Sequence, residues 1–390
     1  MKKIFTLVTA GVLAAGSLSA QAQVSLDGQL TAAEVTAGNY QLIGKFTNPR
    51  GFGDWGLLSL YAASTPTKLY FFVGGTVENN GNAFQLFMDL PGTPGVPVGT
   101  ALPAGAASTS FQNMTARLDL AADMALALRA DGSDYQIEGA SYTSGTVGTS
   151  QKLTSTAGTV AANGMPQNLS MAATIGTFAK FAGARVAYRG TTDGRILTNP
   201  GNVSPNTSAA YGGVGSYGWE IELDRVNMAL NVGTPSLSIF LVQNSGDGGY
   251  LSSDFIPQTS APLTTNGGNL ATSSMVDFAT IVGRQAATIT LGANGVLGTK
   301  VVDAASIGMN VFPNPANGQA TVSYNVASRS EQVSVVLTDL MGRTVRVLET
   351  GAKTVGTQTV SISSADVAAG TYLVQVRVGD NLATRKVVLL

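Results

Sequence analysis

A run of alternating acidic and apolar residues is the strongest candidate for chemistry in this chain. It reads Trp219-Glu220-Ile221-Glu222-Leu223-Asp224. On a β-strand the acidic side chains point to one face and the apolar side chains to the other. Carboxyl groups two residues apart on a strand lie about 7 Å from one another, in the range that glycosidases use. Glu220 and Glu222 are therefore the candidate catalytic pair of a secreted hydrolase.

The same pattern has a simpler interpretation, which we prefer. Antiparallel sheets commonly turn one apolar face to the core and one polar face to water. On this interpretation the segment is an amphipathic strand with a wet acidic face. The sequence then assigns no catalytic residue, and the Glu220/Glu222 pair stays as the alternative.

Two acidic turns offer oxygen ligands for calcium. They are Asp131-Gly132-Ser133-Asp134 and Asn244-Ser245-Gly246-Asp247. Ca²⁺ is held by oxygen ligands, yet Asx–Gly clusters also form plain turns because Asn and Asp bond to the nearby backbone. Asp131, Asp134 and Asp247 are the candidate metal ligands, and calcium is the one cofactor that the sequence suggests.

Four aromatic residues are candidates for stacking on sugar rings. They are Trp55, Tyr61, Tyr70 and Tyr211. An amphipathic ring suits a sugar because it has an apolar face and a polar tip. Their exposure decides whether they form such a surface or belong to the core.

Composition removes several classes of function. The 390 residues include neither Cys nor His, which excludes disulfides, Cys- or His-ligated zinc and Ser–His–Asp catalysis. Charged residues make up 12% of the chain and the net charge is −1. A weakly acidic chain without basic runs is a poor partner for nucleic acid, so none is expected.

The first residues have the order of a secretory signal peptide. Lys2 and Lys3 precede an apolar stretch from Ile4 to Leu18, and Ala20-Gln21-Ala22 supplies a small-x-small cleavage pattern. We predict a signal peptide over residues 1–22 and a mature start near Gln23. No later segment has the length and apolar character of a membrane helix, so no transmembrane segment is expected in the mature chain.

Residues 23–290 predict a large β-sandwich or jelly-roll-like domain. Short runs rich in β-branched and aromatic residues end at Gly, Asn, Ser and Thr turns. Thr31–Glu34 fits a capping box that starts one helical turn. Leu118–Ala130 fits helix or strand, and residues 143–177 predict loops or irregular edge strands. The predicted strands are Asn39–Phe46, Leu57–Ala62, Lys68–Gly74, Ala83–Asp89, Tyr135–Ala140, Ala184–Tyr188, Tyr217–Leu223, Ser236–Val242 and Ala287–Leu291.

After a linker at residues 291–309, the pattern sharpens into a second domain over residues 310–390. Period-2 alternation predicts a seven-strand sandwich of immunoglobulin size. Pro313 and Pro315 mark the end of its first strand, because proline cannot donate to a ladder. Gly342 fits a hairpin connection, and Gly370 is expected to let the chain turn sharply into the next strand. The later predicted strands are Ala320–Tyr324, Val333–Thr338, Val345–Leu348, Thr357–Ile362, Thr371–Val378 and Ala383–Leu389.

Four ordered pieces of this last domain, "VFPNPANG", "DLMGR", "AAGTYLVQV" and "TRKVVLL", resemble the type A carboxy-terminal sorting domain of the type IX secretion system. The resemblance implies export through the periplasm and outer membrane to the medium or cell surface. It implies the translocon and sortase machinery as partners, and a bacterial source of the Bacteroidetes type. The motif positions that it implies are Pro313, Asn314, Pro315, Gly342, Gly370, Tyr372 and Lys386.

A second resemblance covers scattered parts of residues 24–260. Asp27-Gly28-Gln29-Leu30-Thr31-Ala32-Ala33-Glu34, Phe84–Asp89 and Tyr217–Leu223 are similar to segments of family 9 carbohydrate-binding modules and related exported sandwiches. It implies a polysaccharide ligand.

The sequence leaves three functions open for residues 23–290. The favoured one is a non-catalytic β-sandwich that binds glycan or serves a matrix or adhesion role. The second is a glycoside hydrolase, and the third is a purely structural surface protein.

Overall fold

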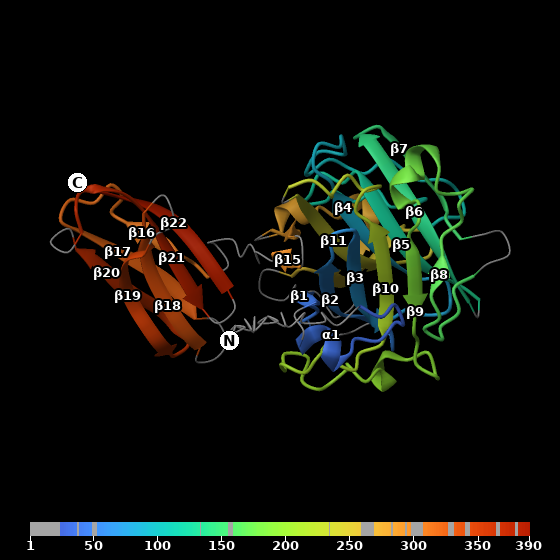
Figure 1. Ribbon diagram of the computed structural model, residues 1–390, viewed down its shortest axis with the longest axis horizontal. Helices are drawn as coiled ribbons and strands as arrows, with labels where there is room; N and C mark the ends of the chain where they lie inside the picture. The colour runs from blue at the N-terminus through green and yellow to red at the C-terminus, as the bar shows by residue number, and fades with distance from the viewer. Residues whose placement is uncertain are drawn as a thin grey trace, which may run out of the picture.

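The computed structural model describes fourteen stretches of the chain, which fall into two β units (Figure 1). The predicted signal peptide, Gly342 and part of the predicted linker lie outside them. The N-terminal unit reaches residue 297 and the C-terminal unit begins at residue 307. The described residues are 24–36, 39–48, 53–132, 134–154, 159–233, 235–258, 269–281, 284–292, 295–297, 307–326, 331–339, 344–363, 367–378 and 381–390.

The N-terminal unit contains two antiparallel sheets. The six-stranded sheet has the order β1-β2-β3-β10-β9-β8. Its strands are β1 (Gln41–Lys45), β2 (Gly56–Ser64), β3 (Lys68–Thr76), β8 (Gln167–Asn168), β9 (Arg185–Tyr188) and β10 (Gly218–Asp224).

The nine-stranded sheet has the order β13-β12-β11-β4-β5-β6-β7, and β14 and β15 extend it beside β11. Its strands are β4 (Ala83–Asp89), β5 (Met124–Asp131), β6 (Asp134–Ser144), β7 (Val147–Lys152), β11 (Ser236–Asn244), β12 (Tyr250–Ile256), β13 (Asn269–Thr272), β14 (Ala287–Leu291) and β15 (Val296–Leu297).

One apolar core lies between these two sheets. Trp219 and Ile221 of β10 enter it from the six-stranded sheet, and Leu86 of β4 and Leu126 of β5 enter it from the nine-stranded sheet. Alternate residues on each strand supply these side chains, as the pleat of a β-strand requires. The predicted all-β, sandwich-like fold is confirmed.

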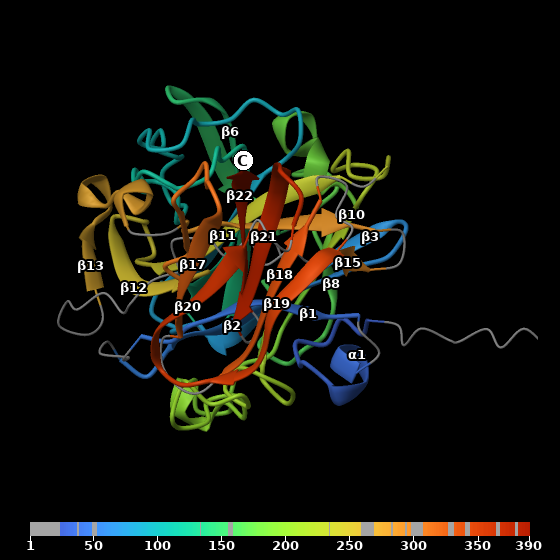
Figure 2. The ribbon, with the colours of Figure 1, turned by 90° about the vertical axis from the view of Figure 1, so that its left-hand side faces the viewer.

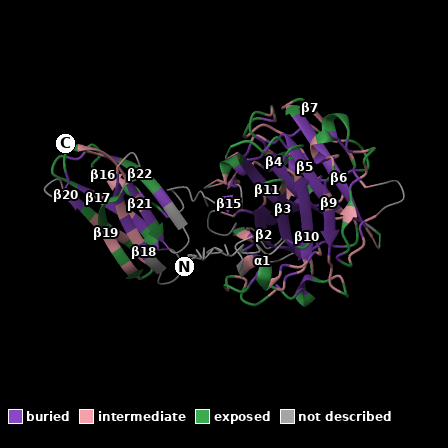
Figure 3. Cartoon of the chain, in the orientation of Figure 1, coloured by how far each residue is buried: buried purple, intermediate pink, exposed green. Residues whose placement is uncertain are grey.

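Both sheets are also covered on their outer faces. On the nine-stranded sheet, Phe87 and Phe240 pack against Phe111 and Phe278, which belong to connecting segments. On the six-stranded sheet, the cover is the first part of the chain, residues 24–36 and 39–40, which we call the N-terminal segment. The central strands of this unit are therefore buried on both sides (Figure 3).

Across the part of the chain that the structure describes, helical structure is confined to short elements. The predicted capping box is confirmed at α1 (Ala32–Thr36), where Glu34 Oε2 accepts hydrogen bonds from the backbone N–H and the hydroxyl of Thr31. The described residues also contain four 3₁₀ turns: η1 (Gly176–Phe181), η2 (Ile196–Thr198), η3 (Ser273–Met275) and η4 (Phe278–Thr280). Within the described chain, none of the helices has the length and apolar character needed to span a bilayer.

The segment that the sequence left open between helix and strand is resolved. Met124–Asp131 forms β5 in the middle of the nine-stranded sheet, whereas Leu118 and Leu120 lie in irregular chain and pack into the outer cover. Alanine and leucine have no strong strand preference, but burial on both faces of a central strand outweighs local propensity.

Two strands continue the N-terminal unit into the segment predicted as a linker. Leu291 at the end of β14 and Val296 in β15 are buried in the core between the sheets. Ile307 and Met309 belong to the core of the C-terminal unit. The sequence interval between the units is thus residues 298–306.

The C-terminal unit is a seven-strand sandwich, as predicted (Figure 2). The three-stranded sheet has the order β16-β17-β20 and the four-stranded sheet the order β19-β18-β21-β22. Their bounds are β16 (Asn310–Phe312), β17 (Gln319–Val326), β18 (Glu331–Thr338), β19 (Thr344–Lys353), β20 (Gly356–Ser363), β21 (Gly370–Val378) and β22 (Asn381–Leu389).

Candidate functional site

Glu220 lies in the middle of β10 and is fully buried. Its Oε2 atom accepts hydrogen bonds from the backbone N–H groups of Asp27 at 2.7 Å and Gly28 at 2.8 Å. Its Oε1 atom accepts a hydrogen bond from the Tyr40 hydroxyl at 2.8 Å. All three donors belong to the N-terminal segment, so this carboxyl group fastens the segment to the sheet.

Burial raises the pKa of Glu220 to about 8, although the hydrogen bonds from Gly28, Tyr40 and Asp27 oppose the rise. Two backbone donors hold Oε2 as an acceptor, so a bound proton belongs on Oε1. There it faces the Tyr40 hydroxyl, which can rotate to accept it. Burial and the neighbouring Glu220 also raise the pKa of Tyr40 well above its ordinary value, so Tyr40 stays neutral.

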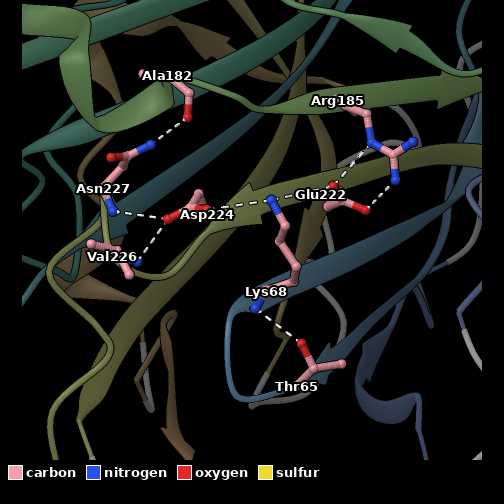
Figure 4. A network of polar contacts seen from close by, with 8 residues as sticks. All are labelled: Thr65, Lys68, Ala182, Arg185, Glu222, Asp224, Val226 and Asn227. Carbon is pink, nitrogen blue, oxygen red and sulfur yellow. Dashed lines mark hydrogen bonds and ion pairs between the residues drawn. The ribbon is translucent and has the colours of Figure 1, made fainter.

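Glu222 lies two residues further along β10 and joins a different network (Figure 4). Arg185 of β9 donates to both of its carboxylate oxygens, with Nε at 3.0 Å from Oε1 and Nη2 at 2.6 Å from Oε2. Lys68 of β3 places its Nζ atom 3.7 Å from Glu222 and 3.3 Å from Asp224. Asp224 also accepts hydrogen bonds from the backbone N–H groups of Val226 and Asn227.

The expectation of a wet acidic face is therefore wrong. The acidic side chains do share one face of β10, but Glu220 and Glu222 are both buried there. The physical reason is that the N-terminal segment covers Glu220, while Arg185 and Lys68 of the neighbouring strands enclose Glu222. Both oxygens of each Glu carboxyl group are hydrogen-bonded within the protein.

Three of the four aromatic candidates are buried, which corrects the idea that they form a stacking surface. Tyr61 and Tyr70 pack under the N-terminal segment, and Tyr211 packs with Leu58. Burial, with the nearby Glu222 as a further cause, raises the pKa of Tyr70 to about 12. Trp55 is half-buried.

The candidate calcium ligands lie in two separate turns. Asp131 and Asp134 close the hairpin between β5 and β6, where Asp134 accepts a hydrogen bond from Thr159. Asp247 lies between β11 and β12 and accepts hydrogen bonds from Ser245, Gly249 and Asn113. In the described part of the chain, no group of three Asp, Glu, His or Cys side chains is arranged to hold a metal ion. A calcium site stays a prediction.

The opening motif Asp27–Glu34 has a structural role that sequence reasoning missed. Gly28 has φ of +70°, and a Cβ atom there would lie 2.6 Å from the backbone nitrogen of Arg189. Its N–H points to Glu220, while Glu34 Oε1 accepts a hydrogen bond from the backbone N–H of Ser25. A glycine beside an Asp was the available signal, because that pair marks a special backbone conformation.

In the C-terminal unit, Asn314 connects the segment after β16 to the last strand. Its Nδ2 atom donates to the Lys386 carbonyl at 2.8 Å, and its Oδ1 atom accepts from the Val388 N–H at 2.9 Å. The amide side chain thus pairs with β22 as a neighbouring strand would. Ala316 continues the pairing, donating to the Val388 carbonyl and accepting from the Leu390 N–H.

The neighbouring motif positions are consistent with this pairing. Pro313 and Pro315 flank Asn314 and have no N–H group that would need a partner. Phe312 and these two prolines are exposed, whereas Ala316 is buried in the core of the unit.

Gly370 has a role different from the predicted sharp turn. It is the first residue of β21, and its φ does not lie in the left-handed region. The Tyr372 ring lies across it, and a Cβ atom at Gly370 would come within 3.3 Å of that ring. The Tyr372 hydroxyl donates to the Ala368 carbonyl at 2.9 Å. Gly370 therefore makes room for Tyr372, which fastens the entry to the strand.

A buried hydroxyl also links the two sheets of this unit. Tyr324 of β17 donates to Glu349 of β19 at 2.6 Å, and Lys353 forms an ion pair with the same carboxylate. Burial acts to raise the pKa of Glu349, but Lys353 and Tyr324 outweigh it and the pKa is lowered. Lys386, the remaining motif position, has an exposed side chain.

Comparison with known proteins identifies the C-terminal unit. Residues 310–390 match the family described as "Secretion system C-terminal sorting domain". No curated protein matches the chain.

Two solved structures are weakly similar to the chain. Dimeric latent PorU from Porphyromonas gingivalis is 12% identical with a TM-score of 0.19, covering 90% of this chain and 34% of that one. The BSP domain of a biofilm-associated protein is 8% identical with a TM-score of 0.16, covering 94% and 53%. This chain therefore spans about a third and about half of their lengths. None of these comparisons supports the resemblance to family 9 carbohydrate-binding modules.

Residues 310–390 thus form a type IX sorting domain, which indicates a secreted cargo protein sorted by that system. Proteins with this tail are secreted or attached to the cell surface by way of the outer membrane. The tail implies interaction with the type IX secretion machinery.

Proposed function

We propose that the N-terminal unit is a non-catalytic extracellular β-sandwich with a matrix or adhesion role, delivered by the C-terminal unit. The observation that carries the proposal is the position of Glu220 and Glu222. Each carboxyl group is buried and has both oxygens bonded to protein donors. A glycosidase acid must instead reach the glycosidic oxygen of its substrate. The two residues instead stabilise the fold, Glu220 by binding the N-terminal segment and Glu222 by pairing with Arg185.

Glycan binding is the second candidate. It accords with an extracellular location, but the aromatic residues first considered for it are mostly buried. A binding surface on this unit would have to use other, exposed groups. Binding to a polysaccharide panel without turnover would favour this candidate over a purely structural role.

The hydrolase alternative is tested with Glu220→Gln and Glu222→Gln in the mature chain. Each variant and the wild type are incubated with the panel and assayed for new reducing ends. We expect no turnover by any of them, and lower thermal stability for Glu222→Gln, because its amide cannot replace the ion pair that the carboxylate makes with Arg185. Wild-type hydrolysis that disappears in both variants would overturn the proposal.

The delivery role is tested by deleting residues 310–390 in the native host. The full-length chain is expected in the medium or on the surface, and the truncated chain in the periplasm. An immunoblot of the three fractions measures the distribution. Export of the truncated chain at the normal level would contradict this role.

A further inference from the structure

The outer face of the four-stranded sheet in the C-terminal unit carries cations with partly exposed apolar side chains. Val374 and Val376 of β21 point into the core, so Leu373, Gln375 and Arg377 point outward. The Arg377 side chain is exposed, and Leu373 and Gln375 are half-buried. These outward-facing side chains of β21 can therefore contact a binding partner.

The strand register brings further residues onto this face. Lys386 of β22 lies opposite Leu373, and Val336 of β18 lies opposite Gln375. Val347 of β19 lies opposite Val336 and is 54% exposed. We call this surface the basic face; it consists of Val336, Val347, Leu373, Gln375, Arg377 and Lys386.

Among the described side chains, no carboxylate opposes these cations on the basic face. Glu349 is on the same sheet but points the other way, to Tyr324 and Lys353. Asp339 lies just beyond the end of β18 and has contacts of its own. Residues 310–390 contain seven Lys and Arg and five Asp and Glu, a net charge of +2, in a chain whose total is −1. Residues 310–390 therefore carry a net charge of opposite sign to that of the chain as a whole.

The outer face of the other sheet is different. Its exposed residues on β20 are Thr357, Thr359 and Ser361, which are short and uncharged. Charge is therefore concentrated on one side of the sandwich. A charged patch with adjoining apolar side chains suits a protein partner, because charge guides the encounter and apolar contact holds the complex.

The last strand of the basic face is fixed from its free edge. The Asn314 amide and the Ala316 backbone pair with residues 386–390 of the chain. Lys386 is therefore held on a strand that is bonded on both sides at this point. Asn314, one of the motif positions, thus helps to hold Lys386 in place on the basic face.

We propose that the basic face is the surface by which the C-terminal unit docks onto an acidic, partly apolar surface of the type IX export machinery. This inference rests on the delivery role above and adds the face and its chemistry to it. Arg377 and Lys386 supply the charge, and Leu373, Val336 and Val347 supply the apolar contact.

The test uses the full-length chain in its native host. The double variant Arg377→Gln/Lys386→Gln lowers the net charge by two, and the matched control Thr357→Glu/Thr359→Glu lowers it equally on the opposite sheet. The exported fraction is expected to fall about tenfold or more for the first and to stay within about twofold of wild type for the control. The charge-preserving pair Arg377→Lys/Lys386→Arg is expected to be exported as the control is.

The outcomes separate this inference from the delivery role. Normal export of Arg377→Gln/Lys386→Gln, while the tail deletion stays in the periplasm, would refute the basic face and leave delivery standing. Equal loss in the control would refute it too, since the effect would then follow net charge. Loss of export in the charge-preserving pair would refute recognition by charge. Unchanged Tm values of the purified mature variants exclude misfolding, and Lys386→Gln alone serves if the double variant does not fold.

Discussion

The two units of the molecule build their sheets differently. In the N-terminal unit, all nine residues of β2 are buried, because a core covers one face and a further layer of chain covers the other. In the C-terminal unit, the residues of β17 alternate between buried and partly or fully exposed, and those of β20 alternate between half-buried and exposed as far as the buried Ile362 (Figure 3). The central strands of the first unit are buried on both faces, whereas the sheets of the second unit each display one face. A sheet with an exposed face can bind another protein through the side chains on that face.

The largest difference between the units is expected in the free energy of unfolding when an outward-facing side chain is truncated in each of them. Phe72→Ala removes a fully buried ring that packs against Tyr40 and Tyr61 beneath the N-terminal segment. The free energy of unfolding should fall by about 3–5 kcal/mol. Both tryptophans of the chain, Trp55 and Trp219, lie in this unit, so their fluorescence in urea follows it alone.

The matched change in the C-terminal unit is Thr359→Ala, at an exposed outward position of β20. Unfolding of that unit, followed by circular dichroism, should shift by no more than about 0.5 kcal/mol. A cost below about 1 kcal/mol for Phe72→Ala would show that the outer layer of the N-terminal unit is not a second core.

The next largest effect is the pH dependence of stability, which in the N-terminal unit depends on its buried carboxyl groups. The folded-state pKa of Glu220 is raised to about 8 from an ordinary value of 4.5. The folded state therefore binds this proton more tightly than the unfolded state. Its contribution to stability is complete below pH 4.5 and is lost as pH rises through about 8. Urea unfolding of the wild type should show this decline.

Glu220→Gln removes that titration and should flatten the pH dependence of the N-terminal unit. Glu78 and Asp123, whose pKa values burial raises to about 7, leave a residual slope of the same sign. An identical slope in wild type and variant would mean that Glu220 is ionised throughout.

A smaller effect is expected where Asn314 pairs with the last strand. Asn314→Ala removes two hydrogen bonds, so the stability of the C-terminal unit should fall by about 1–2 kcal/mol. Exchange of the Val388 amide hydrogen should accelerate, because that N–H loses its acceptor. Asn325→Ala, at an exposed position of β17, is the control. Equal effects at both positions would argue against a special role for Asn314.

The smallest effect is expected at Gly370. Gly370→Ala places a methyl group about 3.3 Å from the Tyr372 ring, so the ring must shift by a few tenths of an ångström. We expect a loss of about 1 kcal/mol in stability, measured by thermal unfolding. Tyr372→Phe removes only the hydroxyl bond to Ala368 and provides a comparison of similar size. No change in either variant would show that this contact does not hold the strand entry.

The sequence predicts the C-terminal unit well because local signals agree there. Alternation along a strand such as Ala320–Tyr324 reports which side is buried, and the sandwich follows. In the N-terminal unit the predicted strands Ala83–Asp89 and Ala287–Leu291 match their bounds, whereas β12 and β13 were not predicted as strands.

The environment of Glu220 could not be predicted in the same way. Its partners Asp27 and Gly28 are more than 190 residues away in sequence, and no periodicity in one segment reveals a cover supplied by another. The acidic face was predicted correctly as a face but not as a buried one. The role of Gly370 was missed for a related reason, since room for a neighbouring ring has no sequence signature separate from that of a turn.

The pairing of Asn314 and Ala316 with residues 386–390 joins nearly the first and the very last parts of the C-terminal unit. A chain cut anywhere before residue 386 loses the partners of Asn314, and the segment after β16 is then left without this pairing.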